Sequence, residues 1–393
     1  MLTSTFQPLH DAMAAQVSRQ FLPGISHVLL RGQQVVDRFV HGQADMEAGQ
    51  PLRGDHLFRI FSNTKLFTSC AVMLLVEDGK LGLDDPIERY LPALAHRQVL
   101  RPGATRIDDV EPAKRSITVR HLMTHTAGLS YGLFDPGTLI FGAYQQSGLH
   151  HPLLTGAQFI DKLATLPLTF HPGEQWEYSV ATDVLGHLVE VVAGQSLGEF
   201  FARRIFQPLG MADTAFTLSP AQFQRLATLY VGVDLLDPTK PGLKRMEDVP
   251  YPGAYQTPQA RPSGGGGLAS TLDDMVRMIQ ALMPGDGPQL LQPGSLAQMF
   301  SNQVAPGLYV QFPNMPANPG RVFGLGSSVL ARPGPFDPPG ATDEVSWGGV
   351  AGTIWFINPR LNIGGVLMTQ RYMGFGNPYT FEFKRLAYQA LGH

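Results

Sequence analysis

The stretch FRIFSNTKLFTSCAVMLLVEDGKL, residues 58–81, is the most informative part of this chain about its architecture. It begins with a short apolar segment of strand-like character and then changes to a helical period. Leu66, Cys70 and Leu74 recur at intervals of four, which places them on one face of a helix, and Gly79 is typical of a helix end. We therefore expect a strand, a tight turn and a long buried helix, in that order.

Ser62 and Lys65 lie at the point where the period changes. Residues three apart share one face of a helix, so the lysine amine can reach the serine hydroxyl. A serine hydroxyl becomes a nucleophile when a base takes its proton, and a partly desolvated lysine can be that base. The positive end of the helix dipole also favours a developing oxyanion nearby. An N-capping serine followed by an exposed lysine gives the same pattern, so this pair alone does not decide between the two.

Segments on both sides of this stretch predict a sheet that is built from both ends of the chain. Strands are expected at 27–31 and 34–42, and again at 352–358 and 363–370, the latter two joined by a hairpin turn. Helices are expected within 1–21 and at 155–165, 181–194, 197–205 and 379–391, and the Pro- and Gly-rich stretch 230–267 is expected to form surface loops. The pattern predicts an α+β fold, an antiparallel sheet with an inserted helical region.

Composition excludes several classes of protein. The formal net charge is −3 and the basic residues are scattered, which argues against a nucleic-acid or anionic-membrane partner. The single cysteine, Cys70, excludes an intrachain disulfide and a Cys-rich metal site. No run approaches the roughly 18 apolar residues of a membrane span. The N-terminal segment is interpreted as an amphipathic helix and not as a secretion signal, so a cytoplasmic location is expected.

Beyond Ser62 and Lys65, several further segments resemble one family. They are LFRIFSNTK (57–65), VEDGKLGLDDPIERYLP (76–92), ITVRHLMTHTAGL (117–129), FHPGEQWEYS (170–179), QPLGM (207–211) and SGGGGLAST (263–271). In this order they resemble class C β-lactamases, penicillin-binding proteins and, most closely, family VIII carboxylesterases. The resemblance runs from about residue 25 to the end of the chain. It implies a β-lactamase-like fold with a discontinuous sheet domain (1–75 and 225–393), a mainly helical domain (76–224) and an active site between them.

The second motif of this family falls on Tyr178-Ser179-Val180. The resemblance implies that the tyrosine faces the nucleophile and shuttles its proton. A nearby lysine cation would lower the pKa of such a tyrosine toward a useful range. Tyr178 is therefore expected to act with Lys65, and Asp183 is expected to be a helix-start or supporting residue.

The third motif is Trp347-Gly348-Gly349, which stands where the lactamases have Lys-Thr-Gly. The two glycines are expected to let an edge strand lie close to the substrate. By resemblance, the backbone N–H groups of Ser62 and Val350 form the oxyanion hole. Losing one such donor costs about 3–4 kcal/mol of transition-state stabilisation.

Two departures from the lactamase pattern indicate the branch of the family. The asparagine of the second motif is Val180 here, and the lysine of the third is Trp347. Without these polar groups the site has no obvious anchor for the carboxylate of an antibiotic, and an uncharged ester suits it better. Tyr131 and Phe134, on a loop, are expected near the substrate entrance.

The sequence thus predicts a serine carboxylesterase for short- to medium-chain esters, with a small-molecule substrate and no cofactor or metal. A β-lactamase, a D-amino-acid peptidase and an acyltransferase remain alternatives on the same fold. A catalytically silent binding or sensor protein is disfavoured because Ser62, Lys65 and Tyr178 are all present.

Three further patterns resemble sites of other kinds, and each lacks a part that such a site needs. Gly128–Gly132 matches the nucleophile elbow of α/β-hydrolases, with Ser130 as nucleophile, but the segment that follows (131–142) has no helical periodicity. His121 and His125 have the i, i+4 spacing of metal ligands, but no third ligand accompanies them, so structural roles are expected. The glycine run 264–267 lacks the Lys of a phosphate-binding loop and is interpreted as a turn before a helix.

Overall fold

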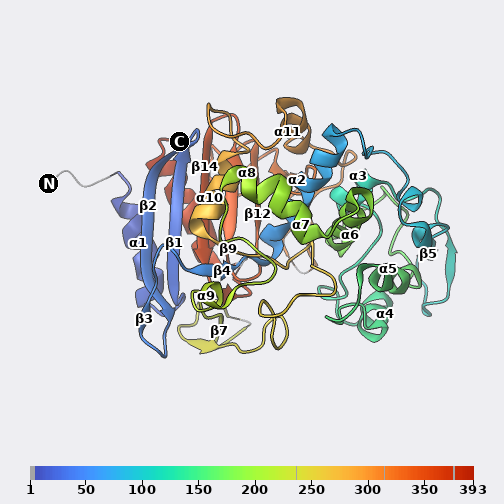
Figure 1. The fold of residues 1–393 in the computed structure, drawn as a ribbon, viewed down its shortest axis with the longest axis horizontal. Helices are drawn as coiled ribbons and strands as arrows, with labels where there is room; N and C mark the ends of the chain where they lie inside the picture. The colour runs from blue at the N-terminus through green and yellow to red at the C-terminus, as the bar shows by residue number, and fades with distance from the viewer. Residues whose placement is uncertain (1–4, 236, 314, 375–376) are drawn as a thin grey trace.

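The computed structural model describes residues 5–235, 237–313, 315–374 and 377–393. In this part of the chain eight strands form one sheet in the order β10-β11-β12-β13-β14-β1-β2-β3. The strands are β1 (Gly24–Arg31), β2 (Gln34–Asp45), β3 (Gln50–Pro51), β10 (Arg321–Phe323), β11 (Ser328–Leu330), β12 (Glu344–Gly348), β13 (Ile354–Asn358) and β14 (Ile363–Thr369). The sheet stands on the left of Figure 1, with blue N-terminal strands beside red C-terminal strands.

The two ends of the chain meet where β1 pairs antiparallel with β14. Val28 lies opposite Val366, and Leu29 lies opposite Gly365. Neighbouring residues on a strand point to opposite faces, so this register presents apolar side chains to both sides of the sheet. A sheet that is buried on both faces needs helices on both, and the structure provides them.

One face of the sheet is covered by the terminal helices α1 (Gln7–Ser18) and α12 (Pro378–Ala390). Leu9 and Phe383 pack there against Leu29 and Leu367. The opposite face is covered by α2 (Thr64–Glu77) and α10 (Leu272–Gln280), whose apolar residues form a second core with Val28. The helix expected after residue 64 is therefore central: every residue from Thr64 to Leu75 is buried.

A mainly helical region lies at the other end of the molecule, on the right of Figure 1. Its helices and those that flank it are α3 (Val119–Met123), α4 (Leu139–Ser147), α5 (Gly156–Ala164), α6 (Ala181–Ala193), α7 (Leu197–Phe201) with a π-helical turn (Ala202–Phe206), α8 (Gln207–Leu209), α9 (Pro220–Phe223) and α11 (Pro293–Met299). Short 3₁₀ turns lie at Phe61–Asn63 (η1), Ile87–Arg89 (η2) and Pro92–Leu94 (η3).

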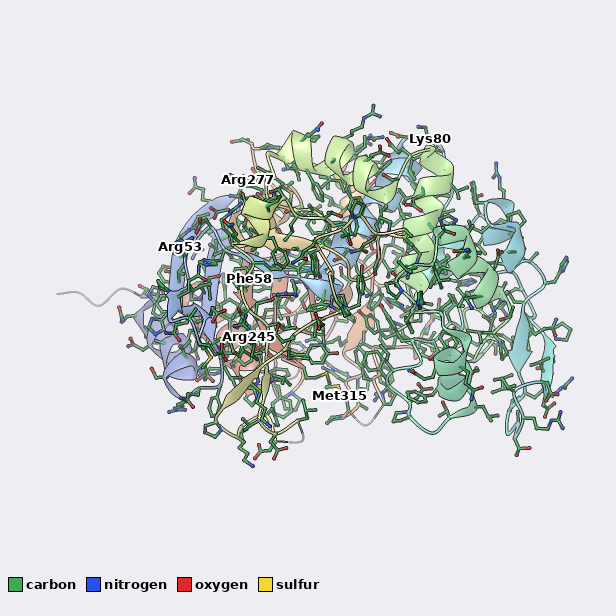
Figure 2. All side chains as sticks on the ribbon, turned by 60° about the horizontal axis from the view of Figure 1, so that its bottom comes forward. Arg53, Phe58, Lys80, Arg245, Arg277 and Met315 are labelled. Carbon is green, nitrogen blue, oxygen red and sulfur yellow. The ribbon has the colours of Figure 1, made fainter. Side chains whose placement is uncertain are left out.

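Smaller sheets complete the fold: β4 (Leu57–Arg59) with β9 (Ala269–Thr271), β5 (Gln98–Leu100) with β6 (Val110–Pro112), and β15 (Arg371–Tyr372) with β7 (Tyr230–Gly232) and β8 (Leu243–Arg245). Figure 2 shows the side chains on this frame. Phe58 is buried, whereas Arg53, Lys80, Arg245 and Arg277 reach the surface.

The predicted α+β class and the expected strands and helices are confirmed, with three corrections. Residues 139–147 are helical because Thr138 caps their N-terminus by accepting the Phe141 N–H at 3.1 Å. The stretch 230–267 contains β7 and β8 as well as loops. The strand of the third motif, β12, is not an edge strand, since β11 and β13 flank it.

The division into domains at residues 75 and 225 stays a prediction. Among the described helices, none is both long and apolar enough to cross a membrane.

Candidate active site

Ser62 lies in the tight turn η1, between the end of β4 and the start of α2. The residue before it, Phe61, has a φ of +41°, so the backbone turns sharply at this point. Two contacts hold the turn: the Asn63 side-chain amide donates to the Thr353 hydroxyl at 3.0 Å, and the Ile60 N–H donates to the Leu268 carbonyl at 3.1 Å. The serine is thus presented at the N-terminal end of the buried helix, as the sequence predicted.

Lys65 is one helical turn further along and is 1% exposed. Its Nζ donates to Ser62 Oγ at 3.3 Å, to the Tyr131 hydroxyl at 3.1 Å and to the Gly265 carbonyl at 2.7 Å. An ammonium group has three N–H donors and no acceptor, so these acceptors match its charged form.

Tyr178 faces Ser62 from the opposite side. Its hydroxyl donates to Ser62 Oγ at 2.8 Å and accepts from Trp347 Nε1 at 3.3 Å. The Lys65 Nζ lies 4.7 Å from the centre of the tyrosine ring. The three side chains that the sequence assigned to catalysis are therefore in mutual contact, and Trp347 joins them.

The electrostatics around Lys65 favour its charged state. Burial opposes the positive charge of the lysine. The neighbouring oxygen atoms of Tyr131, Tyr178 and Asp183 outweigh this effect and raise the pKa of Lys65 above its ordinary value. Burial also raises the pKa of Tyr131, which keeps its hydroxyl protonated as a partner of the lysine.

The Gly265 carbonyl is held in place by Asp183, in the first turn of α6. The carboxylate accepts from Ser263 Oγ at 2.6 Å, from Arg261 at 3.2 Å and from the Gly265 N–H at 3.3 Å. The expected supporting role of Asp183 thus has a concrete form: it ties the glycine run to the helix that follows Tyr178. Sequence reasoning did not assign Gly265 or Arg261, since nothing in a glycine run indicates which carbonyl faces a lysine.

Gly349 has a packing role in addition to the one expected. It does not line the cavity that contains Ser62, although Gly348 and Val350 do. A Cβ at Gly349 would lie 2.4 Å from the Ile60 carbonyl oxygen and 2.6 Å from Thr353 Oγ1. The glycine therefore permits the close approach of its strand end to the turn that carries the nucleophile, and its contact with a substrate stays a prediction.

A cavity of about 1580 Å³ opens beside Ser62. The expected substrate-binding residues Tyr131, Phe134, Val180 and Trp347 all line it. Tyr131 lies deeper than expected, since its hydroxyl contacts Lys65.

The walls of the cavity beside Tyr178 are mainly aromatic. Phe312 packs with its ring centre 5.4 Å from that of Tyr178 and 5.6 Å from that of Phe134. Sequence reasoning missed Phe312 because it lies in an irregular segment far from every motif. Toward the mouth, the exposed side chains include Met315, which is labelled in Figure 2. The cavity thus offers apolar surface around the serine.

The rival patterns do not converge on a site. Ser130 is 2% exposed, does not line the cavity, and its hydroxyl accepts the Gly132 N–H at 3.2 Å. His121 closes a capping box with Thr118 at the start of α3, whereas His125 packs under Tyr178 with ring centres 4.8 Å apart. The interpretation of the glycine run as a turn is confirmed, and Thr271 caps the helix α10 that follows.

Comparison with known proteins shows the family to which this chain belongs. The family model described as Beta-lactamase matches residues 9–389. Protein Rv1367c of Mycobacterium tuberculosis is 37% identical over 330 residues, covering 82% of this chain and 79% of that protein. Esterase EstB of Burkholderia gladioli is 33% identical over 396 residues, covering 96% and 94%. The chain therefore belongs to the β-lactamase family.

A solved structure agrees with this assignment. EstCE1, described as a hydrolase with promiscuous acyltransferase activity, superposes with a TM-score of 0.82 at 28% identity and covers 99% of this chain and 98% of that one. The resemblance to the esterases of this superfamily that the motifs indicated is confirmed.

Proposed function

We propose that this protein is a carboxylesterase that cleaves short- to medium-chain esters through an acyl-enzyme on Ser62. The observation that carries the proposal is the contact of Ser62 Oγ with both the Tyr178 hydroxyl and the Lys65 ammonium, at the wall of an apolar cavity. The similarity to an esterase over nearly the whole chain supports the same reaction.

In the proposed first step Tyr178 reacts as a phenolate: Ser62 Oγ attacks the ester carbonyl and its proton passes to the phenolate oxygen, so the hydrogen bond between the two then runs from Ser62 to Tyr178. Lys65 keeps its proton in this step, because its ammonium group donates to the Gly265 carbonyl and to the Tyr131 hydroxyl, and the lysine and the phenolate act as one coupled pair. The Lys65 ammonium and the Trp347 N–H stabilise negative charge on the phenolate oxygen. Proton transfer of this kind contributes about 10²–10⁴ in rate.

The tetrahedral oxyanion is then held by the backbone N–H groups of Ser62 and Val350, which both line the cavity. As the intermediate collapses, the C–O bond to the alcohol breaks and the alcohol leaves with the proton from Tyr178. Water attacks the acyl-enzyme, its proton returns through the same tyrosine, and the acid leaves with Ser62 restored.

The wall of the cavity favours an uncharged ester over a β-lactam. Val180 and Trp347 occupy the positions where the lactamase motifs carry an amide and an ammonium group. A substrate carboxylate placed against these two side chains would gain no charged partner from them, and Arg321, which lines the same cavity, is already paired with Asp337.

A substitution pair tests the nucleophile. Ser62→Ala removes the attacking oxygen, so hydrolysis of p-nitrophenyl butyrate should fall on the order of 10⁴–10⁶-fold. Ser130→Ala is the matched control and should retain most of the activity, and a fluorophosphonate probe should label wild type and Ser130→Ala but not Ser62→Ala. Activity that survives without Ser62 would refute the mechanism. Faster turnover of nitrocefin than of any p-nitrophenyl ester would refute the esterase assignment.

An acyltransferase is the second candidate, and the size of the cavity favours it. Pockets for small ligands usually enclose about 300–1,000 Å³, whereas this one encloses about 1580 Å³. An alcohol could therefore sit beside the acyl-enzyme and replace water as the acceptor.

A further inference from the structure

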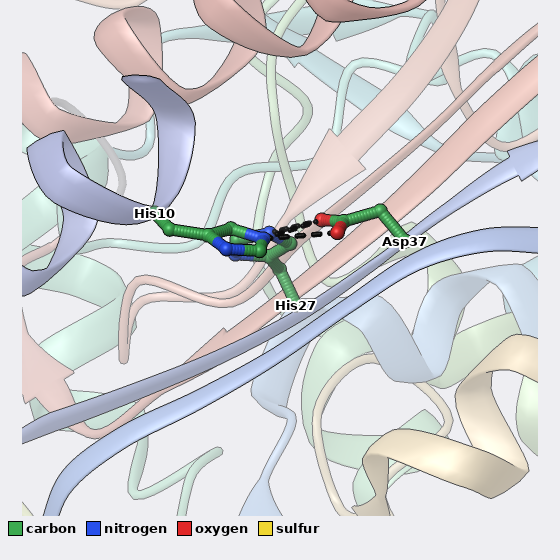
Figure 3. A group of neighbouring side chains, drawn as sticks. All are labelled: His10, His27 and Asp37. Atoms are coloured by element: carbon green, nitrogen blue, oxygen red, sulfur yellow. Dashed lines mark hydrogen bonds and ion pairs between the residues drawn. The ribbon is translucent and has the colours of Figure 1, made fainter. Parts of the chain in front are cut away.

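A second polar cluster lies on the face of the sheet that the terminal helices cover. Among the residues that the structure describes, His10 on α1, His27 on β1 and Asp37 on β2 bring their ligand atoms within 4.8 Å of one another (Figure 3). His10 Nε2 lies 2.9 and 3.0 Å from the two carboxylate oxygens of Asp37, and His27 Nε2 lies 3.0 Å from Oδ2. Both imidazole rings thus point the same type of nitrogen at one carboxylate.

Packing holds the three side chains in this arrangement. The ring of Phe39 stacks on His10 with centres 4.6 Å apart and an interplanar angle of 16°. His27 lies between Phe39 and Phe383, at 5.4 and 5.3 Å. The side chain of His27 is fully buried and that of Asp37 is 7% exposed, whereas that of His10 is 20% exposed. The cluster is therefore preorganised and has one open side, toward solvent.

The cluster has no part in the proposed hydrolysis. None of its three residues lines the cavity beside Ser62. Its residues lie on α1 and the blue strands at the end of the molecule opposite the helical region (Figure 1). A ligand bound here would therefore affect how α1 packs on β1 and β2, and not the chemistry at Ser62.

We propose that His10, His27 and Asp37 bind a divalent transition-metal ion such as Zn²⁺. Two imidazoles and a carboxylate are a donor set that zinc and its neighbours in the series accept, with water in the remaining position. Metal–ligand bonds of about 2.0–2.2 Å place tetrahedral ligands roughly 3.3–3.6 Å apart. The separations of 2.9–3.0 Å must open by a few tenths of an ångström, at His10 by an outward shift of its partly exposed side chain and at the buried His27 by a small movement of the Asp37 carboxylate.

One feature limits the affinity. Nδ1 of His27 is buried and has no hydrogen-bond partner among the described residues. Metal-binding histidines usually donate this second N–H to a neighbouring acceptor, and loss of that contact typically weakens binding about 10–100-fold. The site is therefore a moderate one that fastens the N-terminal helix to β1 and β2, not a tight catalytic centre.

Titration of the chelator-treated full chain with Zn²⁺ tests the proposal. We expect one equivalent to bind and to raise the melting temperature, and Co²⁺ to give the visible absorption of a low-coordinate nitrogen–oxygen site. His10→Ala and Asp37→Asn should each weaken binding at least about 10-fold, because they remove a ligand and not just a neighbour of one. Ester hydrolysis by His10→Ala should remain that of the wild type, since His10 is remote from the cavity.

His41→Ala is the matched control. His41 is an exposed histidine on β2, the strand that also carries Asp37, and the centre of its ring lies 5.8 Å from that of Phe39. It should bind Zn²⁺ as the wild type does. Failure of the wild type to bind Zn²⁺ at 100-fold excess would overturn the proposal, as would full affinity in His10→Ala or loss of affinity in His41→Ala. His10→Ala keeps the test decisive if Asp37→Asn fails to fold.

Discussion

At the residue scale, the proposed chemistry depends on one serine hydroxyl that is reached from two sides. Tyr178 approaches Ser62 at 2.8 Å and Lys65 at 3.3 Å. The lysine makes two further hydrogen bonds that compensate for its burial, to Tyr131 and to the Gly265 carbonyl. Removing these hydrogen bonds would leave the buried ammonium group unpaired, and an unpaired buried charge destabilises a fold by several kcal/mol.

Glu177, the neighbour of Tyr178, provides a pH prediction. Burial raises the pKa of this carboxyl to about 7 in the folded protein, whereas an unfolded chain ionises it near 4.3. Between these values the folded state holds the proton more tightly, so this group reduces stability as the pH rises from about 4.3 to about 7. Glu177→Gln removes that loss and should melt about 2–4 °C higher than wild type at pH 8 but not at pH 4.

Melting curves of both proteins at pH 4 and pH 8 check this expectation. Glu174→Gln is the control three residues away, because hydrogen bonding to Lys114 lowers the pKa of Glu174. It should give no gain at pH 8. An equal shift of Glu177→Gln at both pH values would contradict the assigned cause.

At the scale of elements, the site is a junction between a strand end, a tight turn and two helices. The end of β12 approaches the turn η1 at Gly349, and the helix α6 is linked to the glycine run through Asp183. Each link involves backbone atoms, so the position of Ser62 depends on close packing between segments far apart in the sequence.

Gly349→Ala tests this junction. The added Cβ would meet the backbone oxygen of Ile60, which cannot rotate away, so the turn must shift. A displacement near 1 Å at a reacting group costs about 100-fold, and we expect a loss of this size in kcat/KM for p-nitrophenyl butyrate.

Gly294→Ala in α11 is the matched control, since a Cβ at that position would meet none of the described residues within 4 Å beyond its chain neighbours and its own helix backbone. It should leave kcat/KM unchanged. Circular dichroism should show both variants folded, and wild-type activity in a folded Gly349→Ala would argue against the junction.

At the scale of the whole molecule, the fold places a large apolar cavity beside the serine. The sheet supplies Trp347 on one side, and the helical region supplies Tyr131 and Phe134 on the other. A small acyl group on Ser62 would leave part of this cavity free for an alcohol molecule. The size of the cavity therefore bears on whether water or an alcohol takes the acyl group from the enzyme.

The ratio of ester to acid among the products measures whether an alcohol or water takes the acyl group. With p-nitrophenyl butyrate and increasing benzyl alcohol, we expect benzyl butyrate to form beside butyric acid, because the cavity of about 1580 Å³ holds both acyl group and alcohol. Chromatography gives the ratio of ester to acid, with Ser62→Ala as the blank. Butyric acid as the sole product at every alcohol concentration would rule out the acyltransferase candidate.

Much of the fold and of the candidate site could be predicted from local signals. The change of period at residue 62 marks the start of α2, and alternating apolar segments mark β1, β2, β13 and β14. The helix α4 was missed because its start depends on the Thr138 cap, and β7 and β8 were missed because each is only three residues long. Short strands have too few residues to show a period, and their pairing comes from distant parts of the chain.

The residue types at the site and their order along the chain, Ser62, Lys65, Tyr178 and the Trp347 segment, follow from the amino-acid sequence alone. Which atoms meet depends on the folded chain. Folding brings the Gly265 carbonyl to Lys65, seats Gly349 against Ile60 and joins His10, His27 and Asp37 across three elements. Period and propensity act between near neighbours, whereas these contacts depend on how the sheet and helices pack across long separations in sequence.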